Sequence, residues 1–383
     1  MKVRFLLLSI ASVITIFGLV SATLAQESIY LPMVASDSAS QTTPTATSEA
    51  TATPVATTLR TFTTGIAQNI YAGEVTIDCP NSRINRPGNY GELTDDDGNV
   101  WMVPAPVAGG FTNVNVYNDC TGSGTNDYEA ELTTQTVDES GSEITAYLFA
   151  DNYYEFYVNG TFAGRDSVPF IPFDSKAVRF QAEYPITYAV LMVDWEEYNG
   201  IGLENGRDGV SIGDGGFIAT FSDGTTTNAE WVCKPFYIAP LDNNSCVVID
   251  ENGNADSSAC NSTNETVSCL SNDPENSCMA YLEELPANWM AKEYDDSAWL
   301  SATTYTADDV TNAEAFRDYE ETLFAGADFI WSSNLVLDNA VVCRATIDAP
   351  TTNPDVIANN DRLSQPIHSE RQTPGRSQRN PID

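Results

Sequence analysis

The chain has 383 residues, of which 42% are hydrophobic and 10% aromatic, so it can build about two to three domains with real cores. It carries 54 acidic and 17 basic residues, which gives a formal net charge of −37. This balance argues against nucleic acid and anionic lipid as partners, because no basic face is available to neutralise phosphate groups.

The amino terminus has the pattern of a secretion signal. Lys2 and Arg4 precede an apolar stretch from Phe5 to Val20, and small residues lead to a predicted cleavage after Ala25, with Ala22 as the alternative. We therefore expect a secreted or cell-surface protein with no membrane insertion after cleavage. Retention of the stretch as an anchor stays open, since it approaches the length that spans a bilayer.

Composition divides the rest of the chain into four parts. Residues 26–60 read as a Thr/Pro-rich linker, since the sequence QTTPTATSEATATPVATT has no apolar periodicity. Residues 61–142 read as a small β module, 143–347 as a larger β-sandwich and 348–383 as a disordered tail. The order of signal, TPTAT-type stalk and β-rich module resembles bacterial cell-surface and secreted proteins.

The stretch Ile144–Gly164 predicts two strands joined by a turn at Asn159-Gly160, the strongest short hairpin signal. Along the first strand the side chains alternate between two faces, one with Tyr154, Phe156 and Val158, the other with Tyr153, Glu155 and Tyr157. A pattern this rich in aromatic residues predicts that one face is buried against a second layer. Further short strands separated by Gly, Asp and Asn predict an all-β sandwich.

Three segments carry a family resemblance: ADNYYEFYVNG at 150–160, YDDSAW at 294–299 and FIW…VVCR at 329–344. They resemble the galactose-binding-like jelly-roll domains, which include sugar-binding domains that accompany glycoside hydrolases. The resemblance implies a jelly-roll fold for 143–347 and a role in binding instead of cleavage. Kinship with secreted YHYH-domain proteins is also suspected. The histidine motif that names that group is absent, so no function is carried over from it.

Eight cysteines in an exported chain predict disulfides. Zinc is disfavoured, because no pair has C-x-x-C spacing and the sole histidine, His368, lies in the tail. Spacing does not fix the pairing, but we expect the pairs Cys79–Cys120, Cys233–Cys343, Cys246–Cys260 and Cys269–Cys278. The last two pairs would staple a polar insertion at about residues 243–279.

Calcium is the one cofactor that the acidic segments suggest. In the insertion, four residues have the odd-position spacing of the ligands in an EF-hand loop, namely Asp250, Asn252, Asn254 and Asp256. Ala255 and Asn261 stand where such a loop has Gly and the bidentate Glu, so a disulfide-pinned surface loop is the alternative. A second acidic turn could ligate calcium or be simply hydrated, and it contains Asp95, Asp96, Asp97 and Asn99.

Sugar binding stacks an aromatic ring on a pyranose and reads its hydroxyl groups with polar side chains. The predicted ligand-binding residues are Trp195, Glu196, Tyr198, Asn199, Arg207 and Asp214. The alternative is that Trp195 packs in the core and the others are ordinary loop residues. No catalytic residue is assigned, since His368 lies in the tail, out of reach of a nucleophile. The carboxylates of Asp194 and Glu196 leave hydrolysis open.

These observations favour a secreted or cell-surface, non-catalytic carbohydrate-binding or adhesion protein whose partner is a glycan or cell-surface polysaccharide. Two alternatives from other classes remain. One is a glycan-active hydrolase that uses paired carboxylates, and the other is a structural surface protein without a small-molecule ligand.

Overall fold

The computed structural model describes residues 58–64, 68–69, 91–103, 110, 112–118, 122–125, 127–166, 174–194, 203–206, 209–263, 269, 278–311 and 313–350. All of them belong to one compact unit, Ala56–Asp383. The predicted signal peptide, the linker up to residue 57 and the tail beyond residue 350 lie outside this set. Within it, no helix is both long enough and apolar enough to cross a membrane.

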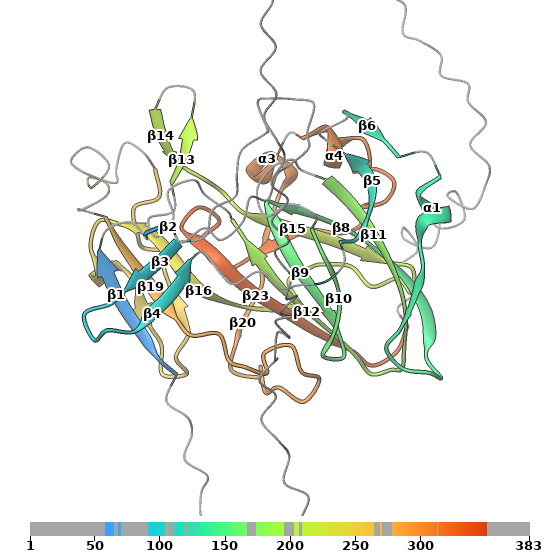
Figure 1. Cartoon of the computed structure of the whole chain (residues 1–383), viewed down its shortest axis with the longest axis horizontal. Helices are drawn as coiled ribbons and strands as arrows, with labels where there is room; N and C mark the ends of the chain where they lie inside the picture. Colours follow the sequence, from blue (N-terminus) through green and yellow to red (C-terminus); the bar gives the residue numbers. More distant parts are fainter. Residues whose placement is uncertain are drawn as a thin grey trace, which may run out of the picture. The chain divides into compact units, whose positions relative to one another are not determined.

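Two eight-stranded sheets dominate the fold and confirm the all-β prediction (Figure 1). The first sheet runs in the order β1 (Arg60–Thr64), β19 (Met279–Glu283), β16 (Val232–Leu241), β23 (Asp338–Ile347), β12 (Ile186–Val193), β9 (Tyr153–Val158) and β10 (Thr161–Arg165), with β20 (Leu300–Ser301) beside β16. The second sheet runs in the order β21 (Thr303–Tyr305), β22 (Phe329–Trp331), β15 (Gly216–Phe221), β8 (Ser142–Asp151), β11 (Asp174–Ala182), β5 (Val114–Asn118) and β6 (Ser123–Gly124), with β7 (Thr134–Thr136) beside β11.

Smaller elements lie around these sheets. A three-stranded sheet contains β2 (Gln68–Asn69), β3 (Gly91–Thr94) and β4 (Val100–Val103). Two further hairpins pair β13 (Leu203–Gly206) with β14 (Gly209–Ile212), and β17 (Val248–Ile249) with β18 (Ala255–Asp256). The described helices are single turns, namely α1 (Tyr128–Glu131), the 3-10 turn η1 (Asn244–Cys246), α3 (Ala307–Val310) and α4 (Glu314–Arg317).

The Asn-Gly hairpin is confirmed as the turn between β9 and β10. Asn159 and Gly160 both have positive φ, 48° and 79°, as a type I′ turn requires. The stretch predicted as two strands nevertheless contains three. β8 and β9 belong to different sheets and only Asn152 lies between them, so the chain crosses the sandwich there.

The main core lies between the two sheets. Tyr154, Phe156 and Val158 of β9 face it, so one face of this strand is buried against a second layer, and Phe156 contacts Phe221 of the second sheet with ring centroids 6.0 Å apart. The opposite face of β9 is buried as well, because Tyr153 belongs to a second cluster on the outer face of the first sheet. This strand is therefore sandwiched on both sides.

Strands from both sides of the predicted boundary at residue 142 share the two large sheets. β1 pairs with β19 in the first sheet, and β5 pairs with β11 in the second. The three-stranded sheet packs Leu93, Trp101 and Val103 against the outer face of the first sheet. Residues 60–118 thus contribute to the same sandwich as the rest of the chain.

Three of the four expected disulfides are present. Cys233–Cys343 joins the neighbouring strands β16 and β23 with Cα atoms 4.2 Å apart. Cys246–Cys260 and Cys269–Cys278 staple the insertion. The fourth expected pair, Cys79–Cys120, lies outside the described residues.

Candidate functional site

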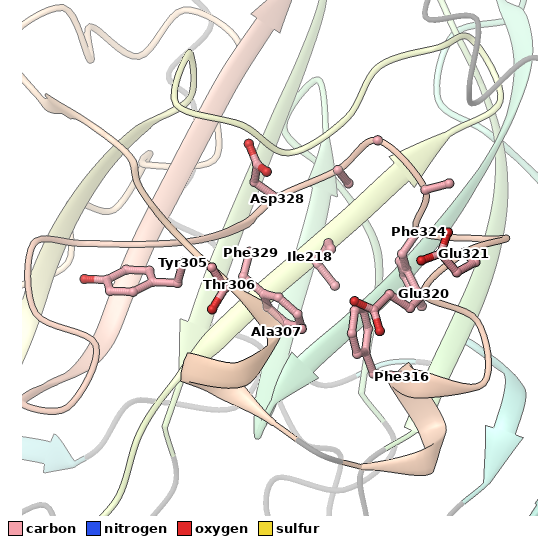
Figure 2. Close-up of a pocket in the computed structure, with 13 residues that line it drawn as sticks. Ile218, Tyr305, Thr306, Ala307, Phe316, Glu320, Glu321, Phe324, Asp328 and Phe329 are labelled. Carbon is pink, nitrogen blue, oxygen red and sulfur yellow. The ribbon is translucent and has the colours of Figure 1, made fainter.

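A cavity of about 550 Å³ lies over the outer face of the second sheet (Figure 2). Its floor includes Ile218 of β15 and Phe329 of β22. Phe217 faces the first sheet, where its ring contacts Tyr154, so the adjacent Ile218 points to the opposite, outer face. The volume falls within the roughly 300–1,000 Å³ of typical ligand sites.

The walls of the cavity come from the segment between β21 and β22. Phe316 on α4 packs against Phe329, with ring centroids 4.8 Å apart, and fixes one wall to the sheet. The turn before α3 forms another part of the wall, because both the backbone N–H and the hydroxyl of Thr306 donate to the Asp309 carboxylate, at 2.9 Å and 2.6 Å. These hydrogen bonds lower the pKa of Asp309.

Three carboxylates line the cavity, those of Glu320, Glu321 and Asp328. Arg317 holds Glu320 at 3.1 Å. The carboxylates of Glu321 and Asp328 are exposed and make no hydrogen bond or ion pair with any described residue. The backbone of Asp328 is nevertheless fixed, because its N–H donates to the Thr227 carbonyl at 3.0 Å and its carbonyl accepts from the Thr227 hydroxyl at 2.7 Å.

Tyr305 lies on the side of the cavity opposite to Phe316 and Glu320, as Figure 2 shows. Its hydroxyl donates to the Ser332 carbonyl at 2.9 Å, which orients a half-buried ring. Burial raises the pKa of Tyr305 to about 12, so the phenol stays neutral at physiological pH. No lysine, arginine or histidine is among the described lining residues. The Tyr305 ring points away from the other lining side chains in Figure 2, so the cavity offers an apolar floor and hydrogen-bond acceptors, but no cation for a phosphate.

Most of the predicted sugar-binding residues cannot be placed against this cavity. Those outside the described residues are Trp195, Glu196, Tyr198, Asn199 and Arg207. Asp214 is half-buried and immediately precedes β15, the strand that supplies Ile218 to the floor. Asp194, the other carboxylate considered for hydrolysis, is buried after β12, where its backbone N–H donates to the Asn339 carbonyl.

Sequence reasoning missed the residues of the cavity. The stretch from 314 to 324, EAFRDYEETLF, carried a signal, since Phe316, Tyr319 and Leu323 recur with helical spacing. Three of the five intervening residues are acidic, namely Asp318, Glu320 and Glu321. That pattern indicates a short amphipathic segment lying on a sheet, with carboxylates on its free side.

The Asp250 carboxylate accepts hydrogen bonds from its own turn. The backbone N–H groups of Asn252 and Asn254 both donate to Oδ1 at 2.8 Å, and the Asn254 amide donates to Oδ2 at 2.9 Å. Burial raises the pKa of Asp250, but these hydrogen bonds outweigh it and lower the pKa overall. Asp256 accepts from the Ser333 hydroxyl at 2.9 Å. The geometry of this loop therefore gives the calcium hypothesis no support.

The acidic turn at Asp95 is built in the same way. Its carboxylate accepts from the backbone N–H groups of Asp97 and Asn99 and from the Trp101 indole. Across the described part of the chain, no group of three or more His, Cys, Asp or Glu side chains is placed to hold a metal ion.

No protein-family model, curated protein or solved structure matches this chain. The resemblance to galactose-binding-like domains stays an expectation on that account. What the fold itself defines is an all-β sandwich protein stapled by disulfides.

Proposed function

We propose that the protein is a secreted or cell-surface, non-catalytic carbohydrate-binding or adhesion protein, and that the cavity over the second sheet is its glycan site. The observation that carries this proposal is that the exposed carboxylates of Glu321 and Asp328 line the same cavity as Phe329, whose ring belongs to its apolar floor. An aromatic ring suits the apolar face of a pyranose, and carboxylates accept strong hydrogen bonds from hydroxyl groups.

Charge narrows the class of glycan. The carboxylates that line the cavity and the net charge of −37 repel anionic polysaccharides. A neutral glycan meets no such repulsion and offers hydroxyl donors to both carboxylates. The three disulfides accord with an oxidising compartment, in which a glycan on a cell surface is accessible.

A glycan-array screen of the full mature chain, with its disulfides intact and with and without EDTA, tests the proposal. We expect binding to one class of neutral glycan, unchanged by EDTA, because the described carboxylates form no metal site. Release of shortened glycans from the array would favour the hydrolase alternative. A blank array from a folded sample would contradict the proposal and favour a structural role.

A further inference from the structure

A buried ionic cluster lies inside the sandwich, away from the cavity. Lys176 of β11 is fully buried, and its side chain shares the inward face of the strand with Val178 and Phe180. Its Nζ lies 2.7 Å from Asp174 Oδ2 and 3.6 Å from Asp166 Oδ1. Both carboxylate side chains are at most 1% exposed, so the cluster is closed to solvent.

A carboxamide on the neighbouring strand meets the same amine. Asn115 of β5 is the direct cross-strand partner of Lys176, and Lys176 Nζ contacts Asn115 Oδ1. The register shifts between Ser175 and Lys176, so Val116 has no residue of β11 opposite it. Such bulges re-aim side chains and are common beside reactive sites. Here the bulge coincides with the point at which the amine meets the carboxamide.

The opposite sheet closes this site. Tyr154 of β9 is fully buried, and its pKa is raised well above the usual value by burial and, in addition, by the charges of Asp166 and Asp174. The charges of Asp166 and Asp174 therefore affect Tyr154 of the first sheet as well as Lys176 of the second. Lys176 is fully buried and Asn115 is half-buried, so the amine is held against the carboxamide in a site largely shielded from bulk water, which combines proximity with protection from hydrolysis.

From this geometry we propose that Lys176 and Asn115 join spontaneously in an intramolecular amide bond, with Asp174 transferring the proton. Asp174 accepts a proton from the Lys176 ammonium group, and the neutral Nζ attacks Asn115 Cγ. The Nζ–Cγ bond forms and the Cγ–Nδ2 bond breaks. Nδ2 takes one proton from Nζ and one from Asp174, and it leaves as ammonium. No oxidant, reductant or cofactor is required, and Asp174 returns to its ionised form.

The bond would tie β5 covalently to β11 inside the second sheet. Because β5 lies next to β6 at one end of that sheet, the cross-link would hold the strands that are most readily pulled away. It would protect a protein exposed to proteases and mechanical load outside the cell. The inference is independent of the proposed glycan site, so either one can fail alone.

Peptide mapping by mass spectrometry of the full mature chain, reduced and digested, tests the bond. We expect the peptides that contain Asn115 and Lys176 to be recovered joined, with the mass of one ammonia molecule missing from their sum. Recovery of the two peptides separate and unmodified would overturn the proposal. A joined product that lacks one water molecule would place the bond on an aspartate, and it would overturn the assignment to Asn115.

Variants add a matched control. Asn115→Ala and Lys176→Arg should abolish the joined peptide and slow the migration of the reduced, denatured chain in electrophoresis. Lys234→Arg alters the other buried lysine, which pairs with Glu283 at 2.7 Å, and should leave the joined peptide in place. Loss of the joined peptide in that control would contradict the assignment. The wild-type peptide map decides the question even where a variant fails to fold.

Discussion

Arg344 of β23 donates from Nε to the Asp296 carboxylate at 2.6 Å on the outer face of the first sheet. The same guanidinium donates to the carbonyls of Trp289 and Ala291 and lies 5.3 Å from the centre of the Tyr294 ring. One buried cation thus contacts four residues of the segment 289–296 and ties that segment to the outer face of the first sheet. The two aspartates of the YDDSAW segment differ in role. Asp295 accepts hydrogen bonds from Ser297 within its own turn, whereas Asp296 binds Arg344.

Replacing Arg344 with lysine should destabilise the protein. Lysine keeps the charge but cannot donate to Asp296 and two carbonyls in the same fixed geometry, so we expect a loss of about 3 kcal/mol in the free energy of unfolding. Urea titration of Arg344→Lys measures it. The matched control is Arg317→Lys, whose side chain is 27% exposed and whose ion pairs should contribute less than about 1 kcal/mol. Equal losses in the two variants would contradict this role for Arg344.

Asp338 should make stability fall as pH rises. Its carboxyl group is fully buried and accepts from the hydroxyls of Ser257 and Ser332 at 2.5 Å each. Burial raises its pKa from 3.8 to about 7. The folded state holds this proton more tightly than the unfolded state. The contribution of this carboxyl group to the free energy of unfolding is therefore complete below about pH 4 and is lost between about pH 4 and 7.

Asp338→Asn removes that titration while keeping a polar group of the same shape. At pH 8 the variant should be more stable than the wild type by roughly 1–4 kcal/mol, and near pH 4 this advantage should disappear. Thermal unfolding of both proteins from pH 4 to 8 gives the comparison, in which the other acidic groups cancel. A difference between the two proteins that does not change with pH would refute the assignment.

The long-range disulfide should contribute more to stability than a local one. Cys233–Cys343 closes a loop of 110 residues, whereas Cys269–Cys278 closes one of 9. The chain-entropy relation gives about 4–5 kcal/mol for the first and about 2–3 kcal/mol for the second. Paired Cys→Ala variants, compared by guanidinium unfolding, should show this order. The reverse order would mean that burial of the insertion, and not loop closure, dominates.

Local features of the fold could be predicted from the sequence, and long-range pairings could not. The turn at Asn159-Gly160 depends on two adjacent residues, so its signal is complete in the sequence. The passage of the chain between sheets at Asn152 has no such local mark. The membership of β1 and β5 in the large sheets likewise depends on partners more than 50 residues away.

The candidate site was harder to predict for a related reason. The sequence drew attention to Trp195 and its neighbours, because an aromatic residue among carboxylates is a familiar pattern for sugar binding. Tyr305 and Asp328 are 23 residues apart and line the same cavity because β21 and β22 pair, with Tyr305 opposite Phe329. Lys176 and its ionic partner Asp174 lie in one strand whose alternation could be read, but Asp166 and Asn115 come from other parts of the chain.

The proposed glycan site is tested most directly by a binding titration with the glycan that the array identifies. Glu321→Gln combined with Asp328→Asn removes two charged acceptors, so the Kd should rise by at least about tenfold. Glu129→Gln combined with Glu131→Gln makes the same charge change on two exposed residues of α1, outside the cavity, and should leave the Kd unchanged. Equal Kd values for the wild type and both double variants would show that glycans bind elsewhere.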